Sequence, residues 1–287
     1  MPELPEVEIV KRSLKNKVKY KKIKKVIISN RNLRFKIQKK FENTLKGRLI
    51  LSVDRFSKYI ILTLSNNKYC LIHLGMSGTL HLVCNDKKDT FTNLSFYHSK
   101  TLPKKHNHIK IKFSKFMIVY NDPRRFGFFK IFNNQKALKD YFSRSGPEAT
   151  SNKFNYKYLK SKLINKEKNI KSFLLDQNYV SGIGNIYANE ILFYCKINPQ
   201  KKCKKINKNQ TIKLVKNSKF VLNLAIKLGG SSIRDFKNIS GKSGLFQNEF
   251  KVYGRENKNC IRENCKGKIS KIFISNRSTF FCNLCQK

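Results

Sequence analysis

Apolar residues near the start of the chain recur at the spacing of a helix. Between positions 6 and 18 they stand three or four residues apart, on one helical face, at Val7, Val10, Leu14 and Val18. Pro5 comes just before them and suits a first helical turn, where no backbone N–H is needed. The pattern predicts an amphipathic helix at the front of the chain.

From about residue 23 to residue 132 the pattern shortens to runs of β-branched and aromatic residues. Such runs occupy positions 48–53, 59–64, 70–74, 109–113 and 116–120. These side chains favour strands, and many short strands in succession are typical of a sandwich or a barrel. We expect a β-sandwich flanked by the first helix.

The second half of the chain changes pattern again. Residues 143–151 concentrate turn formers, which predicts a linker, and residues 156–228 repeat apolar positions at helical spacing. The last thirty or so residues are too few for a core of their own. The predicted fold class is α+β with several parts: an N-terminal β-sandwich domain at 1–143, a linker at 144–151, a helical domain at 152–250 and a terminal module at 251–287.

The chain is strongly basic but able to fold. Lys and Arg number 62 against 17 Asp and Glu, a formal net charge of +45, while 40% of the residues are hydrophobic. Mutual repulsion of this size favours a polyanionic partner, and nucleic acid is the leading candidate. A genome biased toward Lys, Asn and Ile codons explains part of the excess without any function.

Two features of the chain bear on its location. No apolar stretch approaches the ~18 residues of a membrane span, and three glutamates fall among the first eight residues, where a secretory signal carries positive charge. We expect a cytoplasmic, nucleoid-associated protein that has no membrane partner and acts as a monomer.

Four of the eight cysteines cluster at the carboxyl end. Cys260 and Cys265 are separated by four residues, and Cys282 and Cys285 by two, which fits the two knuckles of a four-cysteine zinc ribbon. Two disulfides or four reduced core thiols are the alternatives, and a reducing cytosol disfavours the first. Because no ligand position is left open, we expect one structural Zn²⁺. The cations and aromatic residues between the knuckles favour contact with phosphate.

The amino terminus offers a nucleophile. Removal of Met1 would expose Pro2, whose secondary amine titrates near 8 and is partly unprotonated at neutral pH. Its attack on a sugar C1′ gives an iminium that has no N–H to lose and therefore stays an electron sink. Glu3 and Glu6 lie beside it and could move protons. A proline-rich start that caps a helix with acids is the plainer interpretation.

Five separated motifs together resemble one family. They are Met-Pro-Glu-Leu-Pro-Glu at the start, His-Leu-Gly-Met-Ser-Gly at 73–78, Asp-Pro-Arg-Arg-Phe-Gly at 122–127, Gly-Ile-Gly-Asn-Ile-Tyr at 182–187 and the terminal four-cysteine finger. In this order they are similar to the bacterial formamidopyrimidine-DNA glycosylases, from residue 2 to residue 287. The resemblance implies a β-sandwich, a helix-two-turn-helix domain and a zinc finger hairpin.

The resemblance implies a bifunctional enzyme of base excision repair that acts on damaged double-stranded DNA. Such an enzyme flips out an oxidised purine, 8-oxoguanine or a formamidopyrimidine, cleaves the glycosidic bond and then cuts the strand by β,δ-elimination. By motif, Pro2 is the nucleophile that forms the Schiff base, Glu3 assists sugar opening and Glu6 supports it. Lys58 assists β-elimination, and Arg277 serves δ-elimination and phosphate binding.

Residues that contact DNA follow from the same motifs. Met76 would enter the stack vacated by a flipped base, and Arg124 with Phe126 would face the estranged cytosine. A buried turn methionine, a solvated arginine and a core phenylalanine are the plainer interpretations. By resemblance the remaining contacts to the DNA backbone are His73, His106, Lys166 and Asn185, the last at the start of a helix after a glycine turn.

The chain also departs from the family pattern. In the segment 229–246, which in the family covers the flipped base, Ser243 and Leu245 stand where many relatives have proline and an aromatic residue. The nearest alternative is an endonuclease VIII-like glycosylase acting on oxidised pyrimidines, against which Leu4 and this long segment argue. A non-catalytic zinc-ribbon protein that binds DNA or the ribosome is another. Borohydride trapping on damaged DNA separates an enzyme from that alternative.

Overall fold

The computed structural model describes residues 2–84, 104–231 and 244–287. These residues form two compact units, Met1–Ser143 with Leu228–Leu245, and Arg144–Lys227 with Phe246–Lys287. The first unit is therefore built from two separate stretches of chain. The predicted boundaries at 143, 151 and 250 stay predictions.

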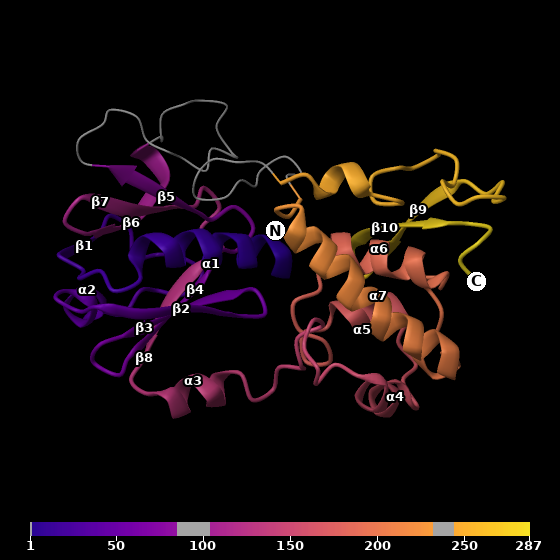
Figure 1. Ribbon diagram of the computed structural model, residues 1–287, viewed down its shortest axis with the longest axis horizontal. Coiled ribbons are helices and arrows are strands. Elements are labelled where there is room, and N and C mark those ends of the chain that lie inside the picture. Colours follow the sequence, from indigo (N-terminus) through magenta and orange to yellow (C-terminus); the bar gives the residue numbers. More distant parts are fainter. Residues whose placement is uncertain (1, 85–103, 232–243) are drawn as a thin grey trace. The chain divides into compact units, whose positions relative to one another are not determined.

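The first unit is built on two antiparallel four-stranded sheets (Figure 1). One sheet has the order β1-β6-β7-β5 and the other β2-β3-β4-β8. The strands are β1 (Lys25–Ile28), β2 (Ile50–Phe56), β3 (Tyr59–Leu64), β4 (Tyr69–His73), β5 (Thr79–Cys84), β6 (Asn107–Lys112), β7 (Phe116–Asn121) and β8 (Phe128–Phe132). Short helices accompany them at α2 (Phe41–Leu45), η1 (Lys104–His106) and α3 (Gln135–Tyr141).

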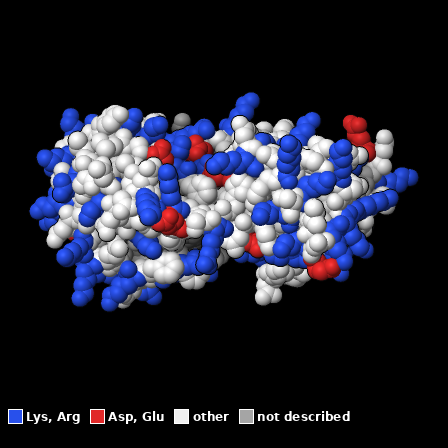
Figure 2. All heavy atoms as spheres, turned by 90° about the horizontal axis from the view of Figure 1, so that it is seen from below, with Lys and Arg blue, Asp and Glu red and all other residues white. Residues whose placement is uncertain are grey.

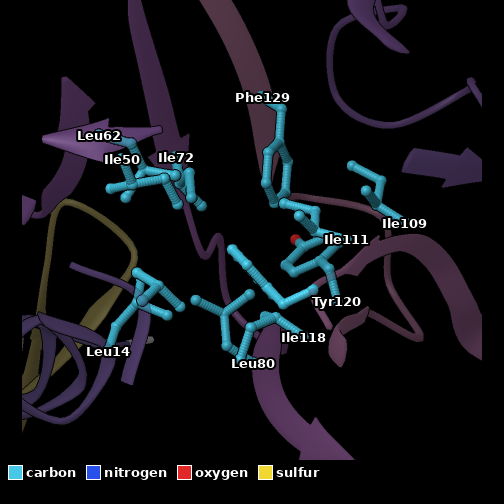
Figure 3. Close-up of a pocket in the computed structure, with 12 residues that line it drawn as sticks. Leu14, Ile50, Leu62, Ile72, Leu80, Ile109, Ile111, Ile118, Tyr120 and Phe129 are labelled. Carbon is cyan, nitrogen blue, oxygen red and sulfur yellow. The ribbon is translucent and has the colours of Figure 1, made fainter. Parts of the chain in front are cut away.

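Helix α1 (Leu4–Val18) packs its apolar face into the core between these sheets. The four residues that the periodicity selects, Val7, Val10, Leu14 and Val18, are all buried there. Figure 3 shows a cavity of about 10 Å³ in this core, lined by Leu14, Ile72 and Phe129 among other apolar side chains. A space of this size barely holds one water and offers it almost no polar partner, so it is a packing gap rather than a ligand site.

The second unit is helical and ends in a β-hairpin. Its elements are α4 (Tyr156–Leu163), α5 (Ile170–Leu175), α6 (Asn185–Cys195), η2 (Cys203–Lys205), α7 (Lys208–Lys227), η3 (Phe246–Glu249), β9 (Ile269–Ile274) and β10 (Arg277–Cys282). Asn155 and Asn169 cap α4 and α5 by accepting backbone N–H groups. Helix α6 packs against α5, α7 and β10, so the helices and the hairpin share a core.

The structure confirms the predicted fold class of a β-sandwich with a flanking helix, a helical region and a terminal hairpin. Within the described ranges, no helix is long and apolar enough to span a bilayer. The segment 229–246 is predicted to cover the base. Its residues 232–243, Ser243 included, lie outside the described residues.

Candidate functional site

The start of α1 brings the three predicted amino-terminal residues together. Glu3 is the N-cap, and its backbone N–H donates to Glu6 Oε2 at 2.9 Å. Pro2 is buried, and Glu3 and Glu6 are 3% and 2% exposed. Local helix geometry alone therefore places two carboxylates beside Pro2, because N-cap and N3 face each other at a helix start.

Glu6 also binds the first residues of the segment 229–246, to which the resemblance assigns the covering of the flipped base. Its Oε1 accepts the backbone N–H of Ser231 at 2.9 Å and the Ser231 hydroxyl at 3.0 Å. Gly230 has φ +81° and passes so close that an added Cβ would lie 3.2 Å from Glu6 Oε1. The carboxylate at the helix start thus fixes the backbone at Gly230 and Ser231.

Lys58 lies in the two-residue turn between β2 and β3. Phe56 pairs with Tyr59 across the turn, and Ser57 between them has φ +54°. The Lys58 side chain is largely buried, with 6% of the residue exposed. A tight hairpin therefore places this lysine inside the fold, although most other lysines that the structure describes are exposed.

His73 ends β4 with its ring packed on Phe128, at a centroid distance of 5.3 Å. Burial, and next the positive charges of Lys58 and Arg34, lower the pKa of His73 to about 4. The ring is therefore neutral at pH 7. Its Nδ1 accepts the backbone N–H of Gly75 at 3.1 Å, so the proton sits on Nε2, which can donate to an anion.

The buried carboxylate of Asp122 joins the two loops that carry the predicted wedge residues. Its Oδ1 accepts the Ser77 hydroxyl, and its Oδ2 accepts the Tyr120 hydroxyl at 2.8 Å and the Gly127 N–H at 2.9 Å. Ser77 Oγ in turn accepts the Arg124 N–H at 3.2 Å. Asp122 is fully buried, so these bonds act in a low dielectric and hold the loops firmly.

Met76, Arg124 and Phe126 stand on these two loops. Met76 is 41% exposed and Phe126 is 44% exposed, which is unusual for large apolar side chains held by so buried a frame. The Arg124 guanidinium lies 4.6 Å from the centre of the Phe126 ring. The interpretations as a buried turn methionine and a core phenylalanine are therefore wrong, and the exposed thioether and phenyl ring are accessible to a partner.

His106 lies beside the same frame. Its carbonyl accepts the Asp122 N–H at 3.0 Å, and its side chain is half-buried at the end of η1. Burial, and next the charge of Lys105, lower the pKa of the imidazole. The first unit thus carries His73, His106 and the wedge residues around one buried carboxylate.

The second unit uses buried polar side chains to hold the turn that carries Arg277. Lys171 on α5 is fully buried, and its Nζ donates to the Ser278 carbonyl at 3.0 Å and to Thr279 Oγ1 at 2.6 Å. Asn185, the first residue of α6, donates its side-chain N–H to the same Ser278 carbonyl at 3.0 Å. Arg277 itself is exposed at the start of β10.

Lys166 lies on the loop before α5, in the second unit. Its Nζ is 5.6 Å from the centre of the Tyr179 ring, and the side chain is half-buried. In this unit Asn185 shares the Ser278 carbonyl with Lys171, next to Arg277 in the chain, whereas Lys166 lies against Tyr179. On the face shown in Figure 2, lysine and arginine side chains far outnumber acidic ones.

The four terminal cysteines converge as the spacing predicts. The Sγ atoms of Cys260, Cys265, Cys282 and Cys285 all lie within 4.8 Å of one another, and the Cys285 N–H donates to Cys282 Sγ at 3.5 Å. Four thiolates at this spacing suit a tetrahedral metal ion, and the cluster can hold one. Both disulfide pairing and a scattered set of core thiols fit the geometry less well.

Three structural residues of the site escape the sequence patterns. Asp122 lies within a recognised motif but carries no role by spacing, and Lys171 is one lysine among many. Glu190 on α6 is fully buried and accepts the backbone N–H groups of Lys251, Val252 and Tyr253 at 2.8 to 3.1 Å. Each looks like a solvated charge in the sequence, and only burial distinguishes it.

Comparison with known proteins agrees with this site. The formamidopyrimidine-DNA glycosylase N-terminal domain matches residues 1–129, and the formamidopyrimidine-DNA glycosylase H2TH domain matches residues 145–237. The formamidopyrimidine-DNA glycosylase of Wolbachia pipientis wMel is 40% identical over 287 residues, and that of Rickettsia bellii is 38% identical over 288, each covering both chains fully.

Comparison with solved structures identifies the same family. A Lactococcus lactis Fpg mutant in complex with DNA containing Fapy-dG matches with a TM-score of 0.89 at 32% identity, over all of both chains. MutM in complex with DNA containing carbocyclic 8-oxo-G matches with a TM-score of 0.88 at 33% identity, again over both whole chains. The chain belongs to the formamidopyrimidine-DNA glycosylase family of DNA repair enzymes.

Proposed function

We propose that this protein is a bifunctional DNA glycosylase and AP lyase that excises oxidised purines, 8-oxoguanine and formamidopyrimidines, from duplex DNA. The observation that carries the proposal is the start of α1, where Pro2 and two buried carboxylates, Glu3 and Glu6, lie together. Acids this deeply buried are rare unless they serve a partner or a reaction. The family membership makes base excision that reaction.

Base release begins at the Pro2 nitrogen, once Met1 is removed. The nitrogen lone pair forms a bond to C1′ of the damaged nucleotide, while the glycosidic bond breaks, the base leaves with its electron pair and gains a proton, and the amine gives up its own N–H proton. The sugar ring opens when C1′–O4′ breaks, and Glu3 supplies the proton that O4′ takes. The product is an iminium that keeps its charge, since the proline nitrogen carries no proton to lose.

Strand cleavage then follows from the iminium. It acidifies the C2′ proton, whose removal expels the 3′ phosphate in β-elimination, and a second elimination expels the 5′ phosphate. Lys58 is held in a buried turn of the unit that carries Pro2 and assists the first proton transfer. Arg277 assists the second elimination and binds phosphate from its exposed place on β10.

The wedge residues serve base flipping. Met76 enters the gap left by the extruded base, while Arg124 and Phe126 replace it against the opposite base by hydrogen bonding and stacking. The exposure of all three side chains supports this role. His73, His106, Lys166 and Asn185 contact the DNA backbone on either side of the lesion.

The four cysteines hold one structural Zn²⁺. They supply a closed set of soft ligands, so the ion would fold the hairpin rather than react. The arrangement serves DNA binding because β10 begins with Arg277 at one end and ends with Cys282 at the other. The enzyme acts as a monomer in the bacterial cytoplasm, on the nucleoid.

Oxidised pyrimidines are the second candidate substrate class. A wild-type Lactococcus lactis Fpg complex with DNA containing an oxidised pyrimidine matches this chain with a TM-score of 0.87 at 31% identity. The segment 229–246 departs from many relatives at Ser243 and Leu245, so its fit to the base decides the ranking.

Borohydride trapping tests the proposal. The mature protein should form a reducible covalent complex with a duplex carrying 8-oxoguanine opposite cytosine, and Pro2→Gly should lose trapping while retaining salt-sensitive binding. Cleavage of duplexes with 8-oxoguanine opposite each of the four bases, and of one with an oxidised pyrimidine, ranks the lesions. Fully active protein that retains Met1 by mass spectrometry would overturn the mechanism.

A further inference from the structure

A buried ion pair connects helix α1 to the turn that carries Lys58. Glu8 lies on α1 and is 7% exposed, and its Oε2 accepts the Nε–H of Arg55 on β2 at 2.8 Å. Burial raises the pKa of Glu8, but the hydrogen bonds from Arg55, Lys11 and Arg12 outweigh it and lower the pKa to about 2. Glu8 is therefore a permanent anion under working conditions.

Arg55 reaches further, to the turn itself. Its Nη1 donates to the Ser57 carbonyl at 2.8 Å, within the same strand-to-turn segment. Ser57 has φ +54°, a left-handed conformation that is strained for a residue with a side chain. Such a conformation persists only where surrounding contacts fix it, and the bond from Arg55 is one such contact.

We propose that Glu8 and Arg55 are positioning residues for the lyase step. Glu8 belongs to the helix that begins beside Pro2, and Arg55 fixes the carbonyl just before Lys58. Together they set where the elimination lysine stands relative to the nucleophile. The inference rests on the proposed function, since it takes Lys58 as the group that assists β-elimination.

The geometry favours positioning over a merely stabilising ion pair. A buried pair recovers little net stability after desolvation, and a hydrophobic pair at this place would serve the core as well. A hydrophobic pair could not hold the Ser57 carbonyl, however, whereas the planar guanidinium binds both Glu8 and that carbonyl at once. The contact to the turn is the part that core packing does not explain.

The experiment separates the two chemical steps. Single-turnover release of 8-oxoguanine, the borohydride-trapped fraction and strand cleavage at a preformed abasic site are measured for Arg55→Gln, Arg55→Lys and Glu8→Gln. Arg12→Gln is the matched control, because Arg12 also binds Glu8 at 2.8 Å but its side chain is 58% exposed and does not touch the turn. Urea midpoints report folding of each variant.

We expect Arg55→Gln to slow strand cleavage about tenfold or more, because small misplacements of a catalytic group cost 10- to 100-fold. Base release should change by less than about threefold, so trapped intermediate accumulates. The lysine in Arg55→Lys can reach Glu8 or the Ser57 carbonyl but not both, so its rate of strand cleavage should lie between those of the wild type and Arg55→Gln. This variant carries the test if Arg55→Gln does not fold. Glu8→Gln should follow Arg55→Gln, and Arg12→Gln should match the wild type.

A double-mutant cycle tests the route through Lys58. In a Lys58→Gln background, Arg55→Gln should add little further loss of strand cleavage, since the positioned group is already gone. Equal losses of base release and cleavage, or full additivity with Lys58→Gln, would overturn the positioning role. Absence of trapping in the wild type would instead overturn the proposed function, so the two failures are distinguishable.

Discussion

Replacing Asp122 tests whether one buried carboxylate holds the wedge loops. Asp122→Ala leaves the Tyr120 hydroxyl and the Gly127 N–H buried without their acceptor, and removes the partner of the Ser77 hydroxyl. Each stranded donor costs about 1–3 kcal/mol, and the costs are not additive. We expect a loss of about 3–5 kcal/mol in the free energy of unfolding, which is a melting temperature lower by about 10 °C.

Asp122→Asn is the milder comparison. The amide oxygen can keep the Tyr120 and Gly127 bonds, while its NH₂ group turns to Ser77, whose hydroxyl rotates to accept. Only charge assistance is lost, so the cost should be about 1–2 kcal/mol. Ser77→Ala removes one donor and leaves the carboxylate, which makes it the control for the smallest loss.

The functional assay compares two duplexes. Anisotropy titrations measure the dissociation constant for a duplex with a tetrahydrofuran abasic analogue and for an undamaged duplex. Asp122→Ala should weaken binding to the first about tenfold and leave the second within about twofold, because phosphate contacts persist while Met76 and Phe126 lose their fixed places. Unchanged discrimination in a destabilised Asp122→Ala protein would refute the reasoning, as would an Asp122→Ala protein of wild-type stability.

Three further outcomes follow from the structure. Removing the metal with a chelator should abolish DNA binding and change the near-ultraviolet circular dichroism, since the hairpin depends on four thiolates; an apoprotein that binds DNA normally would contradict a structural ion. Arg277→Gln should reduce the slope of log K against log salt by about 1, whereas the slope stays constant if Arg277 meets no phosphate. Because the folded-state pKa of Glu8 is lowered to about 2, the part of the stability that depends on its charge is present above pH 4.5 and lost as the pH falls toward 2, on the order of 3 kcal/mol relative to the protonated carboxyl. The fall in the free energy of unfolding with decreasing pH should therefore be shallower in Glu8→Gln than in the wild type, and equal profiles would contradict the lowered pKa of Glu8.

Periodicity was enough to predict the sandwich and its helix. The residues selected on α1 by their spacing are buried, because an amphipathic helix has only one way to cover its apolar face. The cysteine cluster followed from spacing for a similar reason, since two knuckles joined by a hairpin bring four thiols to one point. Predictions of this kind need only the spacing of residues that are close together in the sequence.

Contacts across long sequence separations could not be predicted in the same way. Glu6 and Ser231 are 225 positions apart, and no spacing rule connects them. Lys171 and Thr279 are 108 positions apart, and a lysine in so basic a chain gives no sign of being buried. Burial depends on the tertiary fold, so composition and spacing do not distinguish a buried charged residue from a solvated one.

The two units place their exposed functional residues by the same physical means. In the first, buried Asp122 accepts bonds from two loops that present Met76 and Phe126, and in the second, buried Lys171 donates to the carbonyl beside exposed Arg277. A buried charge is costly unless several partners satisfy it, so its partners cannot move without paying that cost again. The residues that we propose to contact DNA are therefore positioned by buried charges, each opposite in sign to the partial charge of the groups it binds, rather than by contacts at the surface.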